Sequence, residues 1–196
     1  MLKIVLMMYI TLIPPILSGM ANMAFCKSSL LKSCMKPIDG GKCFIDRKRI
    51  FGENKTYKGV IGYILFNTVF YIVWGILCRV LKMENLNFFY ANNANTLQFN
   101  ILIGILLGLA YALFELPNSF LKRRLDIVPG KTMKGPQKIF FIFLDQADSI
   151  FGLALVVWIF YDLGLSLYLL YVLIGAFTHI VVNLFLYKMK LRKNMF

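Results

Sequence analysis

The segment 139–161, IFFIFLDQADSIFGLALVVWIFY, decides the fold class of this chain. It is apolar over nearly its whole length, and at about 1.5 Å per residue a helix of this length crosses the roughly 30 Å hydrocarbon layer of a bilayer. In lipid such a run can only be a helix, because every backbone amide must find its partner within the segment. The segment therefore predicts a membrane-spanning helix, and that helix carries two carboxylates, Asp145 and Asp148.

Four more apolar runs of similar length lie along the 196 residues, of which 59% are hydrophobic and 16% charged. Soluble domains usually have about 45–50% apolar and about 25% charged residues. We expect an all-α integral membrane protein, a bundle of about five transmembrane helices in a single domain, residues 1–196. This composition excludes a soluble nucleotide-binding domain, a β-barrel and a disordered chain. The predicted spans cover residues 4–25, 60–80, 97–120, 139–161 and 165–187, and the two longest loops cover residues 26–59 and 121–138.

One of these runs, residues 97–120, contains Gly104-x-x-x-Gly108. Two glycines at this spacing lie on one face of a helix and leave no side chain between it and a neighbouring backbone. We therefore expect this span to approach another helix closely.

The distribution of basic residues predicts the orientation of the bundle. The chain has 22 basic and 9 acidic residues, and nearly all of the basic ones lie in the two long loops and in the tail after residue 187. Loops rich in lysine and arginine usually remain on the cytoplasmic side of a membrane. We therefore expect both loops and the C-terminus in the cytoplasm and the N-terminus outside. The protein would be a multi-pass protein of the plasma membrane. The net charge of +13 then reflects orientation and an anionic lipid or substrate, with no nucleic acid partner. An alternative takes residues 1–24 as a cleaved signal peptide, which would place loop 26–59 outside.

Asp145 and Asp148 are three residues apart, so both carboxylates lie on one face of their helix. An ionised carboxylate within the membrane costs at least about 2.5–3.5 kcal/mol unless a cation compensates it. A divalent metal with oxygen ligands, such as Mg²⁺, is one solution. The alternative is a salt bridge to a lysine or arginine that only fixes the helices.

Two basic segments flank these acids in the predicted topology. Residues 36–58, KPIDGGKCFIDRKRIFGENKTYK, combine glycines, whose amides can close around phosphate oxygens, with lysines that supply counter-charge. Residues 119–135, SFLKRRLDIVPGKTMKG, place three cations at headgroup level. Each segment has an alternative to phosphate binding. Residues 36–58 would then be a basic loop that lies on anionic headgroups, and residues 119–135 would be an anchor that only fixes the cytoplasmic side of the helix. An anion cradle beside a carboxylate pair suits phosphoryl or nucleotidyl transfer.

Other chemistries have little support in the sequence. His179 is the only histidine, so neither a Ser-His-Asp site nor a histidine-rich metal site can be built, and we expect it to form an interhelical hydrogen bond. Cys26, Cys34, Cys43 and Cys78 lack the spacing of a zinc site.

The order of the motifs resembles that of a known family. Ser119-x-x-Lys122-Arg123 followed by Asp145-x-x-Asp148-Ser149 is similar to the pairing that marks the membrane cytidylyltransferases that form CDP-alcohols, and the CDP-archaeol synthases are the closer match. The same family carries elements similar to residues 37–41, 46–56, 115–124, 129–131 and 144–149. Phosphatidate cytidylyltransferases have an H-G-G stretch before the acid pair, whereas this chain has FFIFL at residues 140–144.

The resemblance implies transfer of CMP from CTP to a lipid phosphate of the 2,3-bis-O-geranylgeranylglycerol 1-phosphate type. The products would be CDP-archaeol and pyrophosphate, and the cofactor would be Mg²⁺. The alternatives are the same reaction on phosphatidate or another lipid phosphate, and a non-enzymatic lipid-binding membrane protein. We expect the two loops to form the active site from these residues: Asp145 and Asp148 as metal ligands, with Asp46 completing the shell; Lys42, Lys55, Thr56 and Lys131 on the triphosphate; Lys122, Arg123 and Arg124 on the lipid phosphate; and Asp39, Asn118 and Ser119 as further substrate-binding residues.

Overall fold

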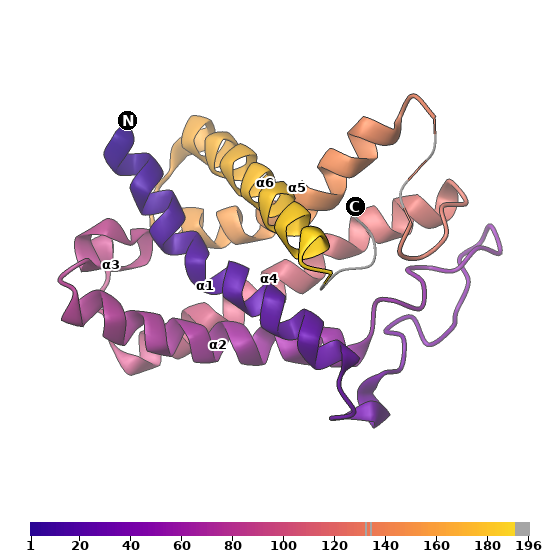
Figure 1. Cartoon of the computed structure of the whole chain (residues 1–196), viewed down its shortest axis with the longest axis horizontal. Coiled ribbons are helices and arrows are strands. Elements are labelled where there is room, and N and C mark those ends of the chain that lie inside the picture. The colour runs from indigo at the N-terminus through magenta and orange to yellow at the C-terminus, as the bar shows by residue number, and fades with distance from the viewer. Residues whose placement is uncertain (132, 134, 191–196) are drawn as a thin grey trace.

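Five long helices dominate the computed structural model, which describes residues 1–131, 133 and 135–190 (Figure 1). Each is long and apolar enough to cross a membrane, as the sequence predicts. They are α1 (Leu2–Lys27), α2 (Tyr57–Val80), α4 (Leu97–Arg124), α5 (Lys138–Phe160) and α6 (Gly164–Lys188). Arg192 and Lys193 of the basic tail lie outside the described residues.

The remaining regular structure is short. It consists of η1 (Lys32–Cys34), η2 (Glu84–Leu86) and α3 (Phe88–Asn92). The described residues form no strand beyond two isolated bridges, one between Pro37 and Thr56 and one between Cys43 and Arg49. These bridges help to fold the long segment that joins α1 to α2.

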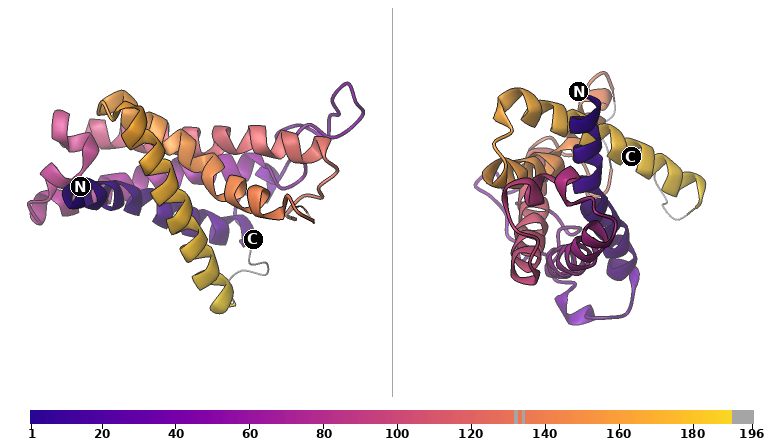
Figure 2. Two further views of the ribbon diagram at one scale, coloured as in Figure 1. Left: turned by 90° about the horizontal axis from the view of Figure 1, so that it is seen from above. Right: turned by 90° about the vertical axis from the view of Figure 1, so that its left-hand side faces the viewer.

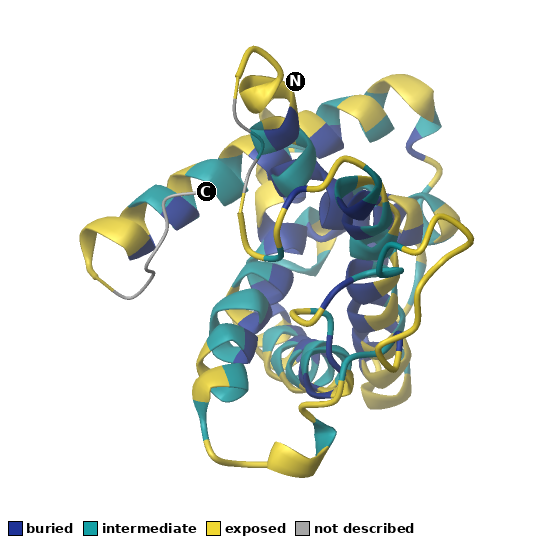
Figure 3. Ribbon diagram, turned by 90° about the vertical axis from the view of Figure 1, so that its right-hand side faces the viewer, coloured by how far each residue is buried: buried dark blue, intermediate teal, exposed yellow. Residues whose placement is uncertain are grey.

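The segment 28–56 and the described residues of the segment that joins α4 to α5 lie at the same end of the bundle, which we call the loop end (Figure 1). α1 and α4 end there, and α2 and α5 begin there. Figure 3 views this end and shows exposed loop segments over buried residues of the helices. The short helix α3 closes the opposite end, where Phe88 and Phe89 are buried and the Phe88 amide donates to Thr11 Oγ1 at 3.2 Å.

The helix that contains the third predicted span continues one turn beyond it. The sequence indicates an end near Phe120, but α4 continues to Arg124, and the Leu125 amide donates to the Leu121 carbonyl at 3.2 Å. Pro117 does not stop the helix, although it cannot donate a backbone hydrogen bond. As a result Lys122, Arg123 and Arg124 stand on a helix rather than on a flexible loop, and their directions are set by it.

Gly104 and Gly108 bring α4 against α2, as their spacing predicts. A Cβ at Gly104 would collide with the backbone of Thr68, and a Cβ at Gly108 would lie 2.5 Å from Cα of Ile64. Real Cβ atoms do not come so close to backbone, so only glycine allows this packing. The contact fixes the start of α2 relative to the end of α4, and both of these segments border the site.

The last helix departs from the rest of the bundle. Toward its C-terminal end α6 leans away from the other helices, as both views in Figure 2 show. Its outward face carries large apolar side chains, among them Phe177 and Phe185, that are exposed in the isolated chain. Such a face suits contact with lipid.

Candidate functional site

A cavity of about 520 Å³ opens at the loop end. All five long helices line it, together with residues of both loop segments. Its volume is in the range of small-molecule sites, about 300–1,000 Å³. The helices supply most of the lining, and the loops contribute only its edge, including Lys55, Thr56 and Lys131.

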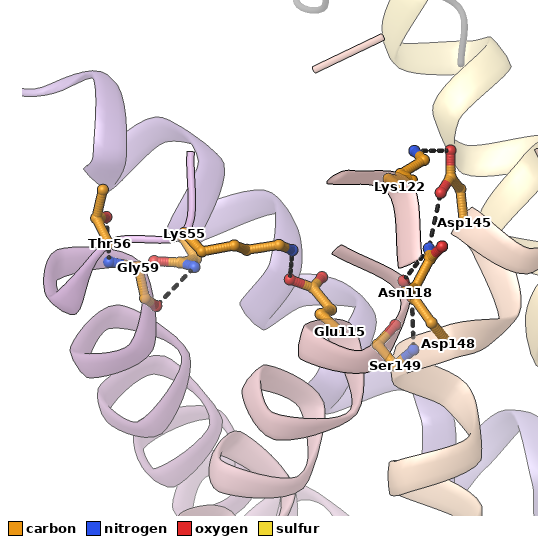
Figure 4. Close-up of polar contacts among 10 residues, drawn as sticks. Lys55, Thr56, Gly59, Glu115, Asn118, Lys122, Asp145, Asp148 and Ser149 are labelled. Carbon is orange, nitrogen blue, oxygen red and sulfur yellow. Dashed lines mark hydrogen bonds and ion pairs between the residues drawn. The ribbon is translucent and has the colours of Figure 1, made fainter. Parts of the chain in front are cut away.

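The acid pair faces α4 across this cavity (Figure 4). Asn118 Nδ2 donates to Asp145 Oδ1 and to Asp148 Oδ2, both at 2.8 Å. The other oxygen of Asp148 accepts from the Ser149 amide at 2.6 Å. Both carboxylates therefore point the same way, as their spacing predicts, and one side-chain amide holds them together.

Cationic compensation of the pair is incomplete. Lys122 Nζ lies 2.6 Å from Asp145 Oδ2, and both side chains are largely buried. Among the described residues, Asp148 forms no ion pair and is held only by neutral donors. The salt bridge weighed as an alternative thus exists for Asp145, whereas Asp148 has no cationic partner among the described residues.

A second buried ion pair joins the start of α2 to α4. Lys55 contacts Glu115, one turn before Asn118 on α4 (Figure 4). Burial opposes the charged ammonium, but the Glu115 carboxylate outweighs it and raises the pKa of Lys55. Thr56 caps α2 by accepting from the Gly59 amide at 3.2 Å. Lys55 is therefore a fixed cation at the cavity wall.

Glu115 is a site residue that sequence reasoning left without a role. The sequence contains one signal that identifies it: an acid inside a predicted span, three residues before Asn118 and therefore on the same face of the helix. What the sequence does not contain is its partner, because Lys55 is 60 residues away along the chain.

Arg123 forms no ion pair in the described part of the chain. It is buried, it lines the cavity, and its Nε has no hydrogen-bond partner in the described part of the chain. The first loop passes beside the Arg123 guanidinium at Gly52, whose backbone has a φ of +109°. A Cβ added at Gly52 would lie 3.6 Å from Arg123 Nη1. Ser119, one turn earlier on α4, is also buried at the cavity.

Four of the predicted site residues do not line the cavity: Asp39, Lys42, Asp46 and Arg124. Asp46 pairs with Arg124 at 2.6 Å, so the structure does not bring it to the acid pair. Arg124 also donates to the Arg49 carbonyl at 2.6 Å and lies over the ring of Phe120. These contacts attach the loop to α4. They occupy Arg124, which the sequence assigns to the lipid phosphate, and Asp46, which it assigns to the metal shell.

Asp39 organises the first loop rather than facing the cavity. Its buried carboxylate accepts from the amides of Gly41, Phe51 and Gly52 and pairs with Arg49 at 2.7 Å. Although burial opposes ionisation, Arg49 and the three amides hold the pKa of this carboxyl well below its usual range. The carboxylate thus ties residues 39–52 into one folded unit.

The oxygen-rich composition of the acid pair and its neighbours fits magnesium. Asp145, Asp148 and Asn118 offer oxygen donors, and Asn118 Oδ1 is buried without a partner among the described residues. Magnesium is usually bound by one or two carboxylates, with water and substrate phosphate filling its other positions. Among the described residues, no group of three or more His, Cys, Asp or Glu side chains is placed to hold a metal ion by itself.

Comparison with known proteins confirms the resemblance seen in the motifs. The family model described as CarS-like, CDP-archaeol synthase, matches residues 1–196. The CDP-archaeol synthase of Methanocaldococcus jannaschii is 29% identical over 80% of this chain and 81% of the relative. That of Methanococcus aeolicus is 32% identical over 80% of each chain, and that of Thermococcus onnurineus is 31% identical over 79% of each. No solved structure matches the chain.

Proposed function

The chain belongs to the CarS-like family of CDP-archaeol synthases, and from this premise we propose that it transfers CMP from CTP to a membrane lipid phosphate. The acceptor is of the 2,3-bis-O-geranylgeranylglycerol 1-phosphate type, and the products are CDP-archaeol and pyrophosphate. The family name supports a nucleotidyltransferase of lipid biosynthesis over a lipid-binding scaffold.

One observation supports the chemistry above all others: two carboxylates share an amide donor inside a cavity whose walls also carry Lys55, Lys122 and Arg123. An oxygen of the lipid phosphate attacks the α-phosphorus of CTP, and the bond from that phosphorus to the bridging oxygen of the β-phosphate breaks. Pyrophosphate leaves with that electron pair. The attacking oxygen is already anionic, so the step needs positioning and charge neutralisation rather than a general base.

We assign the cations by their place in the cavity. Lys55 and Lys131, with the hydroxyl of Thr56, hold the triphosphate at the edge that the loops form. The raised pKa of Lys55 keeps it charged at neutral pH. Arg123 holds the lipid phosphate, because a buried guanidinium with an unused donor suits a phosphate oxygen. Lys122 orients Asp145 through their ion pair.

Asp145, Asp148 and the side-chain oxygen of Asn118 are the residues that would hold Mg²⁺. When bound, the ion neutralises charge on the phosphate oxygens at the reacting phosphorus. Asn118 keeps the two carboxylates aligned, and Lys122 limits their repulsion.

The loop end faces the cytoplasm in this proposal, with the N-terminus outside and the protein in the plasma membrane. The excess of basic residues in the two loop segments supports this orientation. CTP then reaches the cavity from the aqueous side, and the lipid phosphate reaches it from the membrane.

The test is turnover of radiolabelled CTP by purified protein with Mg²⁺, offered the bis-geranylgeranyl ether lipid phosphate or phosphatidate. Lipid-soluble label with the ether lipid alone is the expected result. If label enters the lipid fraction with phosphatidate alone, the acceptor is phosphatidate rather than the ether lipid. If neither lipid becomes labelled in protein shown to be folded, the proposal is refuted. The Asp148→Asn variant is the matched control, because it removes one charge and keeps the shape of the side chain.

A further inference from the structure

The chain that joins α1 to α2 turns sideways before it reaches the glycine-rich part of the first loop. Residues 28–36, which we call the side loop, leave the end of α1, and Figure 1 shows them in purple below the start of α2. The right-hand view in Figure 2 is turned by 90° and also places them outside the outline of the helices. Of the side loop only Met35 lines the cavity. The side loop therefore projects from the flank of the bundle.

Hydrogen bonds fix both ends of the side loop. The buried ammonium of Lys58, in the first turn of α2, donates to the Ser28 carbonyl at 2.9 Å and lies over the ring of Phe25. At the other end the Tyr57 amide donates to the Lys36 carbonyl at 3.1 Å. The position of the side loop is therefore set by the ends of α1 and α2.

The lengths of these two helices place the side loop at the level of the lipid headgroups. α1 has 26 residues and α2 has 24, so at about 1.5 Å per residue they are about 39 and about 36 Å long. The hydrocarbon layer is roughly 30 Å thick, and the headgroup layers bring the total to roughly 40–45 Å. Helices of this length reach into the headgroups, and a segment that leaves the end of α1 sideways stays there.

The side chains that the side loop exposes are of two kinds. Leu30 and Leu31 are 64% and 51% exposed. Three exposed lysines accompany them: Lys27 at the end of α1, Lys32 and Lys36. The first acidic residue of the sequence is Asp39, which is buried, so this surface is apolar and positively charged.

We propose that the side loop docks on the membrane leaflet at the loop end and binds anionic lipid headgroups there. Its two leucines enter the boundary between headgroups and acyl chains, and its lysines contact the lipid phosphates. An amphipathic segment binds such a surface through buried apolar area and through attraction between its cations and the lipid charge. The inference does not depend on the proposed reaction or on the orientation of the chain, because it rests on the flank position and on the exposed side chains.

A tryptophan probe tests the docking in the full-length protein. Trp74 and Trp158, the two tryptophans of the sequence, are replaced by phenylalanine, and Leu30→Trp is added. The protein is placed in lipid nanodiscs of phosphatidylcholine alone, or of equal parts phosphatidylcholine and phosphatidylglycerol. Ile45→Trp in the same background is the matched control. Ile45 is 91% exposed and belongs to the part of the first loop that extends beyond the helix ends (Figure 1).

We expect the emission of Leu30→Trp to lie at shorter wavelength than that of Ile45→Trp, and to shift further when phosphatidylglycerol is present. Each lysine near an anionic surface favours binding about fivefold, so adding Lys32→Gln and Lys36→Gln should weaken docking about 30-fold. The additional shift caused by phosphatidylglycerol should then disappear. Arg47→Gln removes an exposed charge elsewhere in the first loop and should leave that shift unchanged.

Two results would overturn the proposal in protein whose thermal midpoint matches that of the wild type. If Leu30→Trp emits at the same wavelength as Ile45→Trp in both kinds of nanodisc, the side loop lies in water. If its shift does not depend on phosphatidylglycerol or on the two lysines, the side loop does not recognise anionic headgroups. Ser29→Trp, at an exposed neighbouring position, takes the place of Leu30→Trp if that variant does not keep the wild-type midpoint.

Discussion

Lys122 on α4 and Asp145 on α5 form an ion pair with 2.6 Å between Nζ and Oδ2. The pair joins the last turn of α4 to the first turns of α5, and it compensates only one of the two acids that Asn118 bridges. Asp148 is left with neutral donors among the described residues, which makes it the more informative position for mutation.

Asp148→Asn should abolish transfer without unfolding the protein. The variant loses a charged oxygen donor, so we expect label from CTP in the lipid fraction to fall at least about 100-fold. Its thermal midpoint without substrate should be unchanged or higher, because a buried carboxylate without a cationic partner is costly. Normal turnover in this variant, or CTP binding that persists unchanged when Mg²⁺ is chelated, would contradict the metal role of the acid pair.

The two neighbouring arginines of α4 should separate by function. Arg123→Gln should raise the KM for the lipid phosphate about tenfold while leaving the KM for CTP unchanged, because a charge-assisted contact to one phosphate is lost. Arg124→Gln is the comparison: it breaks the contacts to Asp46 and to the Arg49 carbonyl. We expect it to lower stability and leave the KM for the lipid unchanged. The assignment of Arg123 fails if both variants change the same kinetic constant.

The Lys55–Glu115 pair should show strong coupling in unfolding experiments in detergent. Glu115→Gln leaves a largely buried ammonium without its partner and should lower the free energy of unfolding by about 2 kcal/mol. The double variant Lys55→Met/Glu115→Gln should recover part of this loss, because neither charge then remains. As a control, Lys48→Met removes the exposed partner of Asp126 and should cost no more than about 1 kcal/mol. If the losses in unfolding free energy from Lys55→Met and Glu115→Gln simply add in the double variant, the two side chains do not stabilise the fold through their ion pair.

Acid should loosen the first loop through Asp39. Its native pKa lies well below the value of about 3.9 expected in an unfolded chain. The resulting stabilisation is complete above that value and is lost as the pH falls toward the native pKa. Hydrogen exchange in residues 39–52, corrected for its intrinsic pH dependence, should therefore rise below about pH 4. Asp39→Asn should show the rise already at neutral pH, and equal protection in both proteins would refute this role.

The sequence predicts the parts of this molecule that local pattern determines. Hydropathy predicts five long apolar helices, and the structure has five helices long and apolar enough to cross a membrane among its described residues. The spacing of Asp145 and Asp148 puts them on one face because helix periodicity is local. The partners of Asp39 and Asp46 could not be predicted. Both acids sit in a glycine-rich basic loop. Only its fold decides that Asp39 pairs with Arg49 rather than binding substrate, and that Asp46 pairs with Arg124 rather than joining the metal shell. Glu115 remained without a role for the same reason, since Lys55 reaches it from a distant segment.

Gly108 should be intolerant of even one added carbon. A Cβ there would lie 2.5 Å from Cα of Ile64, and backbone cannot yield as a flexible side chain can. We expect Gly108→Ala to lower the thermal midpoint of the purified protein and to reduce turnover, because Lys55 directly precedes the N-cap of α2 and Asn118 lies on α4. Gly19→Ala is the matched control: its Cβ would meet no described atom within 4 Å, and alanine is favoured over glycine within a helix by roughly 0.5–1 kcal/mol. A midpoint for Gly108→Ala equal to that of Gly19→Ala would show that the two helices do not pack through this glycine face.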